Sequence, residues 1–216
     1  MYSIAKFFQR LLDLVLPLSP ESLIARSISE EVLAGLLNPV TVRGERWITA
    51  LFPYQNPKIR ALIRAVKYRG EKAPLTALGR VAADEILEII AEKKTLSGWS
   101  NIVIVPIPIS PERLRSRGYN QAERITLALL PHLAGTVSYA PDVLRRQERK
   151  SQVEVKPHDR KKNIAGAFSV NNPAKVSGKE IILIDDVVES GATLSDARRA
   201  LTDAGATEVI AIAIAH

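Results

Sequence analysis

Residues 181–194 have the sequence IILIDDVVESGATL, and this stretch decides the fold. Its four leading apolar residues predict a strand over Ile181–Ile184 that is buried on both faces. After a turn, a helix is predicted over 192–204, followed by Gly205 at a C-terminal cap position and by a strand over 209–214. Strand, helix and strand within about 35 residues form a crossover unit of a parallel sheet, so we predict an α/β fold.

The carboxyl end of the first predicted strand carries two acids, Asp185 and Asp186, at the edge where α/β sheets bind ligands. Successive strand residues point to opposite faces, so the two acids are expected to differ in role. Gly191 would let the backbone approach a ligand, and the helix start offers free N–H groups to a phosphate, with hydroxyls from Ser190 and Thr193. This predicts a ribose-phosphate site. In the alternative, the acids merely end a strand and Ser190 caps the helix.

The rest of the chain alternates between predicted helices and strands. We take residues 1–46 as a helical N-terminal segment and 47–216 as the main domain. A charged loop is predicted after Pro108. The other predicted elements are helices over 3–16, 21–37, 57–70, 74–93 and 120–130 and strands over 47–52, 102–105 and 167–170.

Composition excludes several classes of site. The chain has no cysteine, which excludes disulfides, thiolate zinc sites and cysteine nucleophiles, and its three histidines lie far apart. No apolar run is long enough to cross a membrane, so no membrane partner is expected. The apolar stretch Leu11–Leu18 is interrupted by Asp13 and Pro17, and it predicts a short helix rather than a secretion signal. We therefore expect a cytoplasmic protein.

The net charge of +7 is concentrated in one segment. Residues 143–162 contain eight basic and three acidic side chains, and 145–160 have no clear period, which indicates a mobile loop. A polyanion is the natural partner of such a segment, either pyrophosphate or a nucleic acid. The alternative is an ordinary exposed face with no ligand.

The 181–194 stretch resembles the diphosphate-ribose signature of the type I phosphoribosyltransferases. Further motifs, in order along the chain, resemble the ComF-like branch of that family: Lys67–Gly70, Val105–Pro108, Arg117–Ala122 and Asn163–Phe168. The resemblance covers residues 47–216. It implies a type I phosphoribosyltransferase-like parallel sheet flanked by helices.

The resemblance also implies a ligand, 5-phosphoribosyl-1-diphosphate, bound with a Mg²⁺ that is held mainly through the ligand and not by a dedicated protein metal site. Residues 145–160 would correspond to a flexible loop that closes over the site and excludes water. The implied contacts are the ribose hydroxyls for Asp185 and Asp186, the 5′-phosphate for Glu189, Ser190, Gly191, Ala192 and Thr193, and pyrophosphate for Pro106, Ile107 and Pro108, with Arg113, Arg115 and Arg117 beyond them.

The three arginines could clamp pyrophosphate oxygens bidentately, or each could belong to a solvated charged loop. Two features depart from the family. ComF-like proteins usually begin with a cysteine zinc ribbon, whereas residues 1–46 contain no cysteine. Glu189 stands where many members have threonine, and it is either an outward solvated residue or a general base toward the acceptor.

Two functions fit these features. The first is an enzyme that transfers the phosphoribosyl group to a nitrogen nucleophile with release of pyrophosphate, using Asp185, Asp186 and Glu189 and acting through positioning and electrostatics. The second is a non-catalytic ComF-like competence factor that handles single-stranded DNA. The basic segment favours the second, but no aromatic residues are interleaved with it to stack bases. The sequence leaves open which base or amine is the acceptor and whether the chain forms a homo-oligomer.

Overall fold

The computed structural model describes residues 20–69, 72–147 and 166–216. Within them a six-stranded sheet has the order β1-β2-β8-β7-β3-β4, with β1 and β2 antiparallel and the other neighbours parallel. A central parallel sheet flanked by helices confirms the predicted fold class. The strands are β1 Val40–Val42, β2 Glu45–Phe52, β3 Ile102–Pro106, β4 Ser138–Tyr139, β7 Glu180–Val187 and β8 Glu208–Ala215.

The central strands are buried on both faces because alternate residues enter two different cores. In β7, Ile182 and Ile184 belong to one core and Ile181 and Leu183 to the other. In β8 the isoleucines at 210, 212 and 214 join the first core, whereas residues 209, 211 and 213 join the second. Since side chains alternate across a strand, continuous apolar runs are what a sheet covered on both sides requires.

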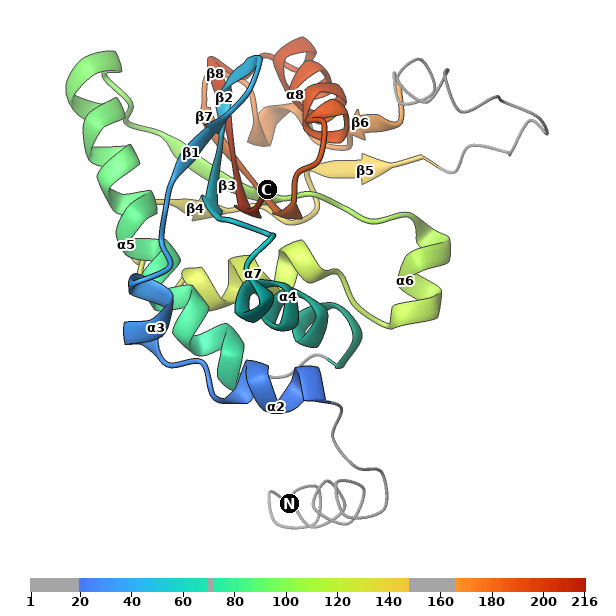
Figure 1. Cartoon of the computed structure of the whole chain (residues 1–216). Helices are drawn as coiled ribbons and strands as arrows, with labels where there is room; N and C mark the ends of the chain where they lie inside the picture. Colours follow the sequence, from blue (N-terminus) through green and yellow to red (C-terminus); the bar gives the residue numbers. More distant parts are fainter. Residues whose placement is uncertain (1–19, 70–71, 148–165) are drawn as a thin grey trace, which may run out of the picture.

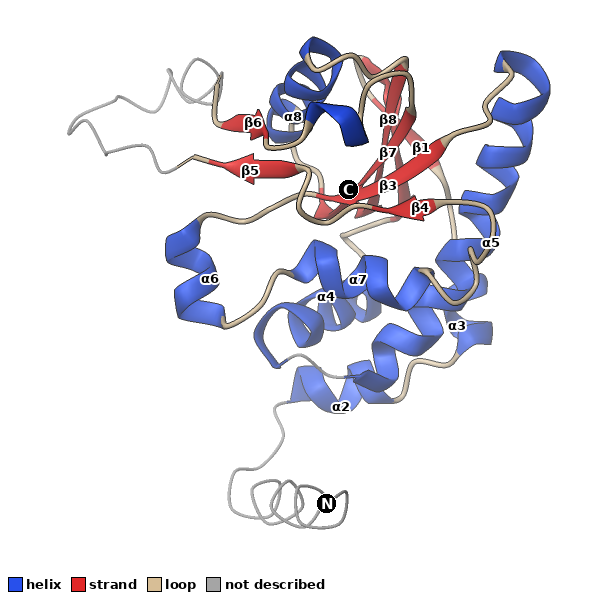
Figure 2. Ribbon diagram, turned by 180° about the vertical axis from the view of Figure 1, so that it is seen from behind, coloured by secondary structure: helices blue, strands red, loops and turns tan. Residues whose placement is uncertain are grey.

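Helices cover one face of the sheet, and α8 with a two-stranded ribbon covers the other (Figures 1 and 2). Gly79 in α5 lets α7 come close, since a Cβ there would lie 2.3 Å from the Ala128 carbonyl oxygen. On the first face lie α2 Pro20–Arg26, α3 Glu30–Ala34, α4 Pro57–Arg69, α5 Lys72–Ser97 and α7 Gln121–Leu129; on the second lie α8 Ala192–Asp203 and the antiparallel strands β5 Leu144–Arg146 and β6 Phe168–Val170.

Most of the predicted elements occur at or near their predicted positions, but three predictions are wrong. The helix expected over 21–37 is two short helices, because Ser29 breaks the run and accepts a hydrogen bond from the Val32 N–H as the cap of α3. The charged loop expected after Pro108 contains the helix α6, Pro111–Arg117. Ser110 caps its start and Gly118, with φ at 77°, ends it.

The third wrong prediction concerns the start of the charged segment. Residues 145 and 146 of the predicted loop belong to strand β5, which pairs with β6 over 168–170, and are therefore not a loop. The rest of the predicted loop, 148–160, lies outside the described residues, as does the helix predicted over 3–16. The boundary predicted between 46 and 47 falls within β2, and β1 pairs with β2 in the same sheet. None of the described helices is both long and apolar enough to cross a membrane.

Candidate functional site

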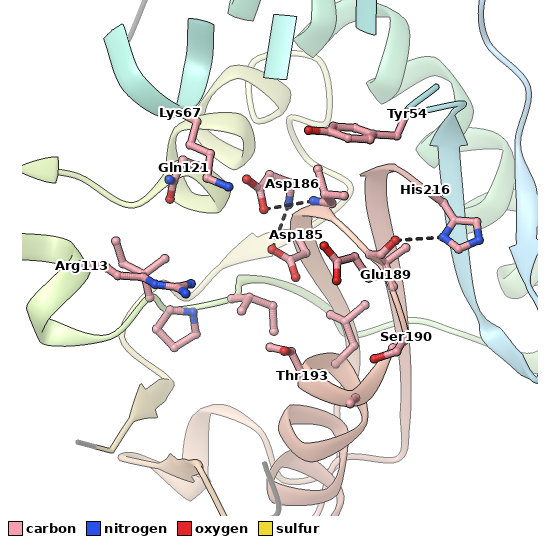
Figure 3. A pocket seen from close by; sticks show the side chains of 18 of the residues that line it. Tyr54, Lys67, Arg113, Gln121, Asp185, Asp186, Glu189, Ser190, Thr193 and His216 are labelled. Carbon is pink, nitrogen blue, oxygen red and sulfur yellow. Dashed lines mark hydrogen bonds between the residues drawn. The ribbon is translucent and has the colours of Figure 1, made fainter. Parts of the chain in front are cut away.

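A pocket of about 640 Å³ opens at the carboxyl ends of the central strands (Figure 3). Its walls come from the end of β7, the turn into α8, the segment after β3, α6, α7 and β5, and from α4 and the residues that precede it. Segments far apart in the sequence meet here because parallel strands all end at the same edge of the sheet.

Two carboxylates lie at the centre of one wall. Asp185 and Asp186 are partly buried, line the pocket and are not turned into either core. The Asp186 N–H donates to Asp185 Oδ1 at 2.9 Å, and the Val187 N–H donates to Asp186 Oδ1 at 3.0 Å. Burial, and then the charge of Asp186, raise the pKa of Asp185 well above its ordinary value. A pair that is costly to ionise favours hydroxyl donors or a cation as its partner.

The turn from β7 into α8 forms the next wall, and residues 189–193 all line the pocket. Gly191 occupies the N-cap position with φ at 70°, and no side chain caps the helix, so Ser190 is not its cap. The first turn of a 12-residue helix therefore offers its N–H groups and its positive dipole end to an anion. Glu189 is exposed and also lines the pocket.

Packing within the chain, and not only the approach of a ligand, requires glycine at position 191. Its positive φ favours glycine, and a Cβ would lie 3.0 Å from Ile48 Cδ1 and 3.3 Å from Glu45 Cγ. The turn thus rests directly on strand β2, and this contact fixes where the helix start lies relative to the pocket.

Cationic side chains also line the pocket, and Arg113 lies on its side away from Ser190 (Figure 3). Ile107, Pro108, Arg113 and Arg117 line it, whereas Pro106 is buried in β3 and neither Pro106 nor Arg115 is among its described lining residues. The predicted pyrophosphate residues are therefore brought together only in part.

Arg146, at the end of β5, also lines the pocket and was not among the predicted site residues. Burial and then the positive charge of Arg113 lower the pKa of Arg146, while the negative charges of Asp185 and Asp196 act in the opposite direction. Its guanidinium lies 5.4 Å from the centre of the Phe168 ring. The sequence placed Arg146 in the basic segment, but it gave no reason to prefer this arginine to its neighbours.

Residues of the Arg117–Ala122 motif hold the elements around the pocket together. Gly118 ends α6, and the Tyr119 hydroxyl donates to the Val66 carbonyl at 3.0 Å, which ties the end of α4 to this corner. Asn120 Nδ2 donates to the Ile107 carbonyl at 2.9 Å, and Asn120 Oδ1 accepts from the Ala122 N–H at 3.2 Å as the cap of α7. Gln121 follows and lines the pocket. The motif therefore joins two walls of the site.

Sequence reasoning also missed Tyr54, Gln55, Lys67 and His216, which line the same pocket. His216 Nδ1 lies 2.9 Å from the Val188 carbonyl, and the Tyr54 N–H donates to the His216 carbonyl, so strand ends hold both residues in place. Lys67 belongs to the Lys67–Gly70 motif, and the sequence offers no comparable indication for the other three residues.

Residues 76–216 match the model of the phosphoribosyl transferase domain. The chain belongs to the phosphoribosyl transferase domain family. The matched range includes the acid pair, the start of α8 and the arginines that line the pocket.

Curated relatives agree with the ComF-like branch of this family. The chain is 31% identical over 150 residues to competence protein ComFC of Bacillus subtilis, a match covering 69% of this chain and 56% of that protein. It is 27% identical over 153 residues to DNA utilization protein YhgH of Escherichia coli K12, covering 71% of this chain and 65% of that protein. The chain thus spans less than two thirds of the length of these relatives.

Among solved structures, the chain is similar to a hypoxanthine phosphoribosyltransferase from Staphylococcus aureus. The TM-score is 0.38 with 12% sequence identity, and the match covers 64% of this chain and 61% of that one.

Proposed function

We propose that this member of the phosphoribosyl transferase domain family binds 5-phosphoribosyl-1-diphosphate with Mg²⁺ and transfers the phosphoribosyl group to a nitrogen nucleophile, releasing pyrophosphate. The observation that carries the proposal is the division of one pocket. Asp185 and Asp186 lie near an uncapped helix start, whereas Arg113 lies on the opposite side of the pocket (Figure 3), which Arg117 and Arg146 also line. A sugar with a phosphate at one end and a diphosphate at the other matches that division.

The chain's own residues would act by positioning and electrostatics. The start of α8, with the hydroxyls of Ser190 and Thr193, would hold the 5′-phosphate. The carboxylates of Asp185 and Asp186 would accept hydrogen bonds from the ribose hydroxyls and stabilise positive charge that develops at C1′. The arginines would hold the departing pyrophosphate by charge-assisted hydrogen bonds. The acceptor nitrogen then forms its bond to C1′ as the bond from C1′ to the pyrophosphate oxygen breaks.

Mg²⁺ is part of this proposal, and the residues present fit it. Asp185 and Asp186 offer carboxylate oxygens, and Mg²⁺ is commonly held by one or two carboxylates together with substrate phosphates. Among the described residues, no group of three or more His, Asp or Glu side chains could hold a metal by itself. The ion would therefore be held mainly through oxygens of the ligand, where it would neutralise charge on the leaving group.

Glu189 would serve as the base that takes the proton from the acceptor nitrogen, since it lines the pocket next to the acid pair. The proposal includes a cytoplasmic location.

Titration with 5-phosphoribosyl-1-diphosphate, with and without Mg²⁺, tests the binding step. We expect binding to the native chain with Mg²⁺ and none to the Asp185→Asn/Asp186→Asn variant. Asp84→Asn is a matched control, because Asp84 is an exposed aspartate of α5 outside the pocket. Equal binding by the native chain and the double variant would contradict the proposal.

Pyrophosphate release with a panel of bases and ammonia tests the transfer step. No release with any of them would contradict the transfer step, and only the binding function would stand.

A second proposal is favoured by the names of the relatives, a competence protein and a DNA utilization protein. In this proposal the chain handles single-stranded DNA through its basic segment, of which the structure describes Arg145 as exposed. Affinity for a single-stranded oligonucleotide should then fall steeply as salt rises, because neutralised phosphates release counterions. An affinity that barely changes with salt would contradict this proposal.

A further inference from the structure

Gln121 is the first residue of α7, and this residue is only 2% exposed although it lines the pocket. Its Nε2 is buried, and no atom within the described parts of the chain accepts a hydrogen bond from it. It is the one buried side-chain nitrogen or oxygen of those parts that lacks a partner. Buried polar groups are nearly always paired, so an exception in the wall of a pocket calls for a partner that enters from outside the chain.

The elements around Gln121 hold it in place. Its neighbour Asn120 uses both ends of its carboxamide, on the Ile107 carbonyl and on the Ala122 N–H. Gly79 permits α7 to lie against α5 at a distance that no other residue type allows. The donor is therefore presented by a rigid corner, and little freedom would be lost when a ligand meets it.

The position of Gln121 indicates which part of a ligand it meets. Its side chain lies between those of Lys67 and Arg113, across the pocket from Thr193 at the start of α8 (Figure 3). Lys67 and Arg113 carry positive charge, so this wall suits an oxygen-rich anion. A neutral donor among them adds direction, because a carboxamide N–H must point at its acceptor whereas a charge attracts from any angle.

We propose that Gln121 is a specificity-determining residue whose Nε2 donates a hydrogen bond to a diphosphate oxygen of the ligand. This inference rests on the proposed function, since it assigns one contact within the site for 5-phosphoribosyl-1-diphosphate. It adds a residue to the pyrophosphate wall that is neither cationic nor part of the turn after β3. It also gives the Arg117–Ala122 motif a ligand-binding end.

The test compares three ligands in Mg²⁺ buffer: 5-phosphoribosyl-1-diphosphate, inorganic pyrophosphate, and ribose 5-phosphate, which lacks the diphosphate. Gln121→Met keeps the size and removes the donor, and Gln121→Glu replaces the donor with a negative charge. Gln147→Met is the matched control, because Gln147 is exposed and does not line the pocket. Calorimetric titration gives each Kd, and thermal unfolding without ligand gives each Tm.

We expect Gln121→Met to weaken the first two ligands about ten- to a hundred-fold, which converts to about 1.4–2.8 kcal/mol. Gln121→Glu should weaken them more, and ribose 5-phosphate should bind both variants as it binds the native chain. The Tm of ligand-free Gln121→Met should equal or exceed the native value, because an unpaired buried donor is removed.

Equal weakening of ribose 5-phosphate by Gln121→Met would show a structural role and overturn the inference. So would unchanged binding of all three ligands, or a loss confined to an acceptor base in the transfer assay. A native chain that binds neither phosphorylated sugar would instead refute the proposed function, and the inference with it.

Discussion

Replacing Gly191 with alanine would test whether the turn into α8 is both a packing point and the phosphate site. Two costs follow from the structure. The backbone is left-handed, with φ at 70°, and the new Cβ would lie 3.0 Å from Ile48 Cδ1 and 3.3 Å from Glu45 Cγ. The first cost is conformational and the second is steric, and a suitable control separates them.

That control is Gly178→Ala. Gly178 has φ at 71°, yet a Cβ there would have no atom within 4 Å, and it precedes β7 at the end of the sheet away from the pocket. A left-handed alanine costs about 1–2 kcal/mol, so Gly178→Ala should lower the free energy of unfolding by about that amount. Overpacking costs about 1–3 kcal/mol more, so Gly191→Ala should lose about 2–5 kcal/mol in total.

Thermal unfolding measures both variants, and each kcal/mol should lower the Tm of a domain of this size by about 2–4 °C. Titration with 5-phosphoribosyl-1-diphosphate gives the functional half, because shifting the turn moves the helix N–H groups away from the phosphate. We expect weaker binding for Gly191→Ala alone. Equal Tm losses in the two variants would refute the steric argument, and unchanged binding by Gly191→Ala would refute the assignment of this turn to the phosphate.

Two further predictions concern acids whose pKa values the fold shifts. In Mg²⁺-free buffer Asp185→Asn should stabilise the ligand-free chain. The pKa of Asp185 is raised in the folded state, so native stability falls as the pH rises from the unfolded pKa through the folded pKa. The gain in Tm should therefore be largest above that range and absent at acid pH, and a gain that is the same at every pH would contradict this. Asp196→Asn should lower the free energy of unfolding by about 1.5–3 kcal/mol, since its carboxylate accepts from the N–H groups of Gly166 and Ala167, each at 2.7 Å. Burial raises the pKa of Asp196, but hydrogen bonds from Arg199 and these N–H groups outweigh burial and lower the pKa. The difference in the free energy of unfolding between the native chain and the variant, measured by chemical denaturation, should therefore shrink as the pH falls through that lowered pKa. A difference that grows would contradict the reasoning.

The sequence predicted the central unit of the fold well because its signals are local. The continuous apolar run before Asp185 fits a strand that is buried on both faces of a sheet. The helix after Gly191 ends next to Gly205. The carboxyl end of β7 and the start of α8 are neighbours in the chain, so the acids and the phosphate turn could be assigned together.

Two of the wrong predictions concern helix starts that the local sequence does indicate. Ser110 followed by Pro111 is a helix start, and Gly118 is a helix stop, yet the charges between them suggested a loop. In the N-terminal part, Ser29 followed by two glutamates marked the start of a new helix within the predicted one.

Other features carried no local signal. Strand β1 has three residues, and it is a strand because β2 pairs with it. Arg146 was one basic residue among eight until the pairing of β5 with β6 set it beside Phe168 and the pocket.

By itself, then, the chain's order of residues determined the parallel crossover unit, the acid pair and the helix start, since each depends on residues within a few positions of one another. The tertiary structure alone decided that Lys67, Gln121 and Arg146 line the same pocket as that acid pair, and that Gly191 must be glycine because Ile48 lies against it. The physical reason is that burial, pairing and steric contact depend on neighbours in space, which the folding of distant segments supplies.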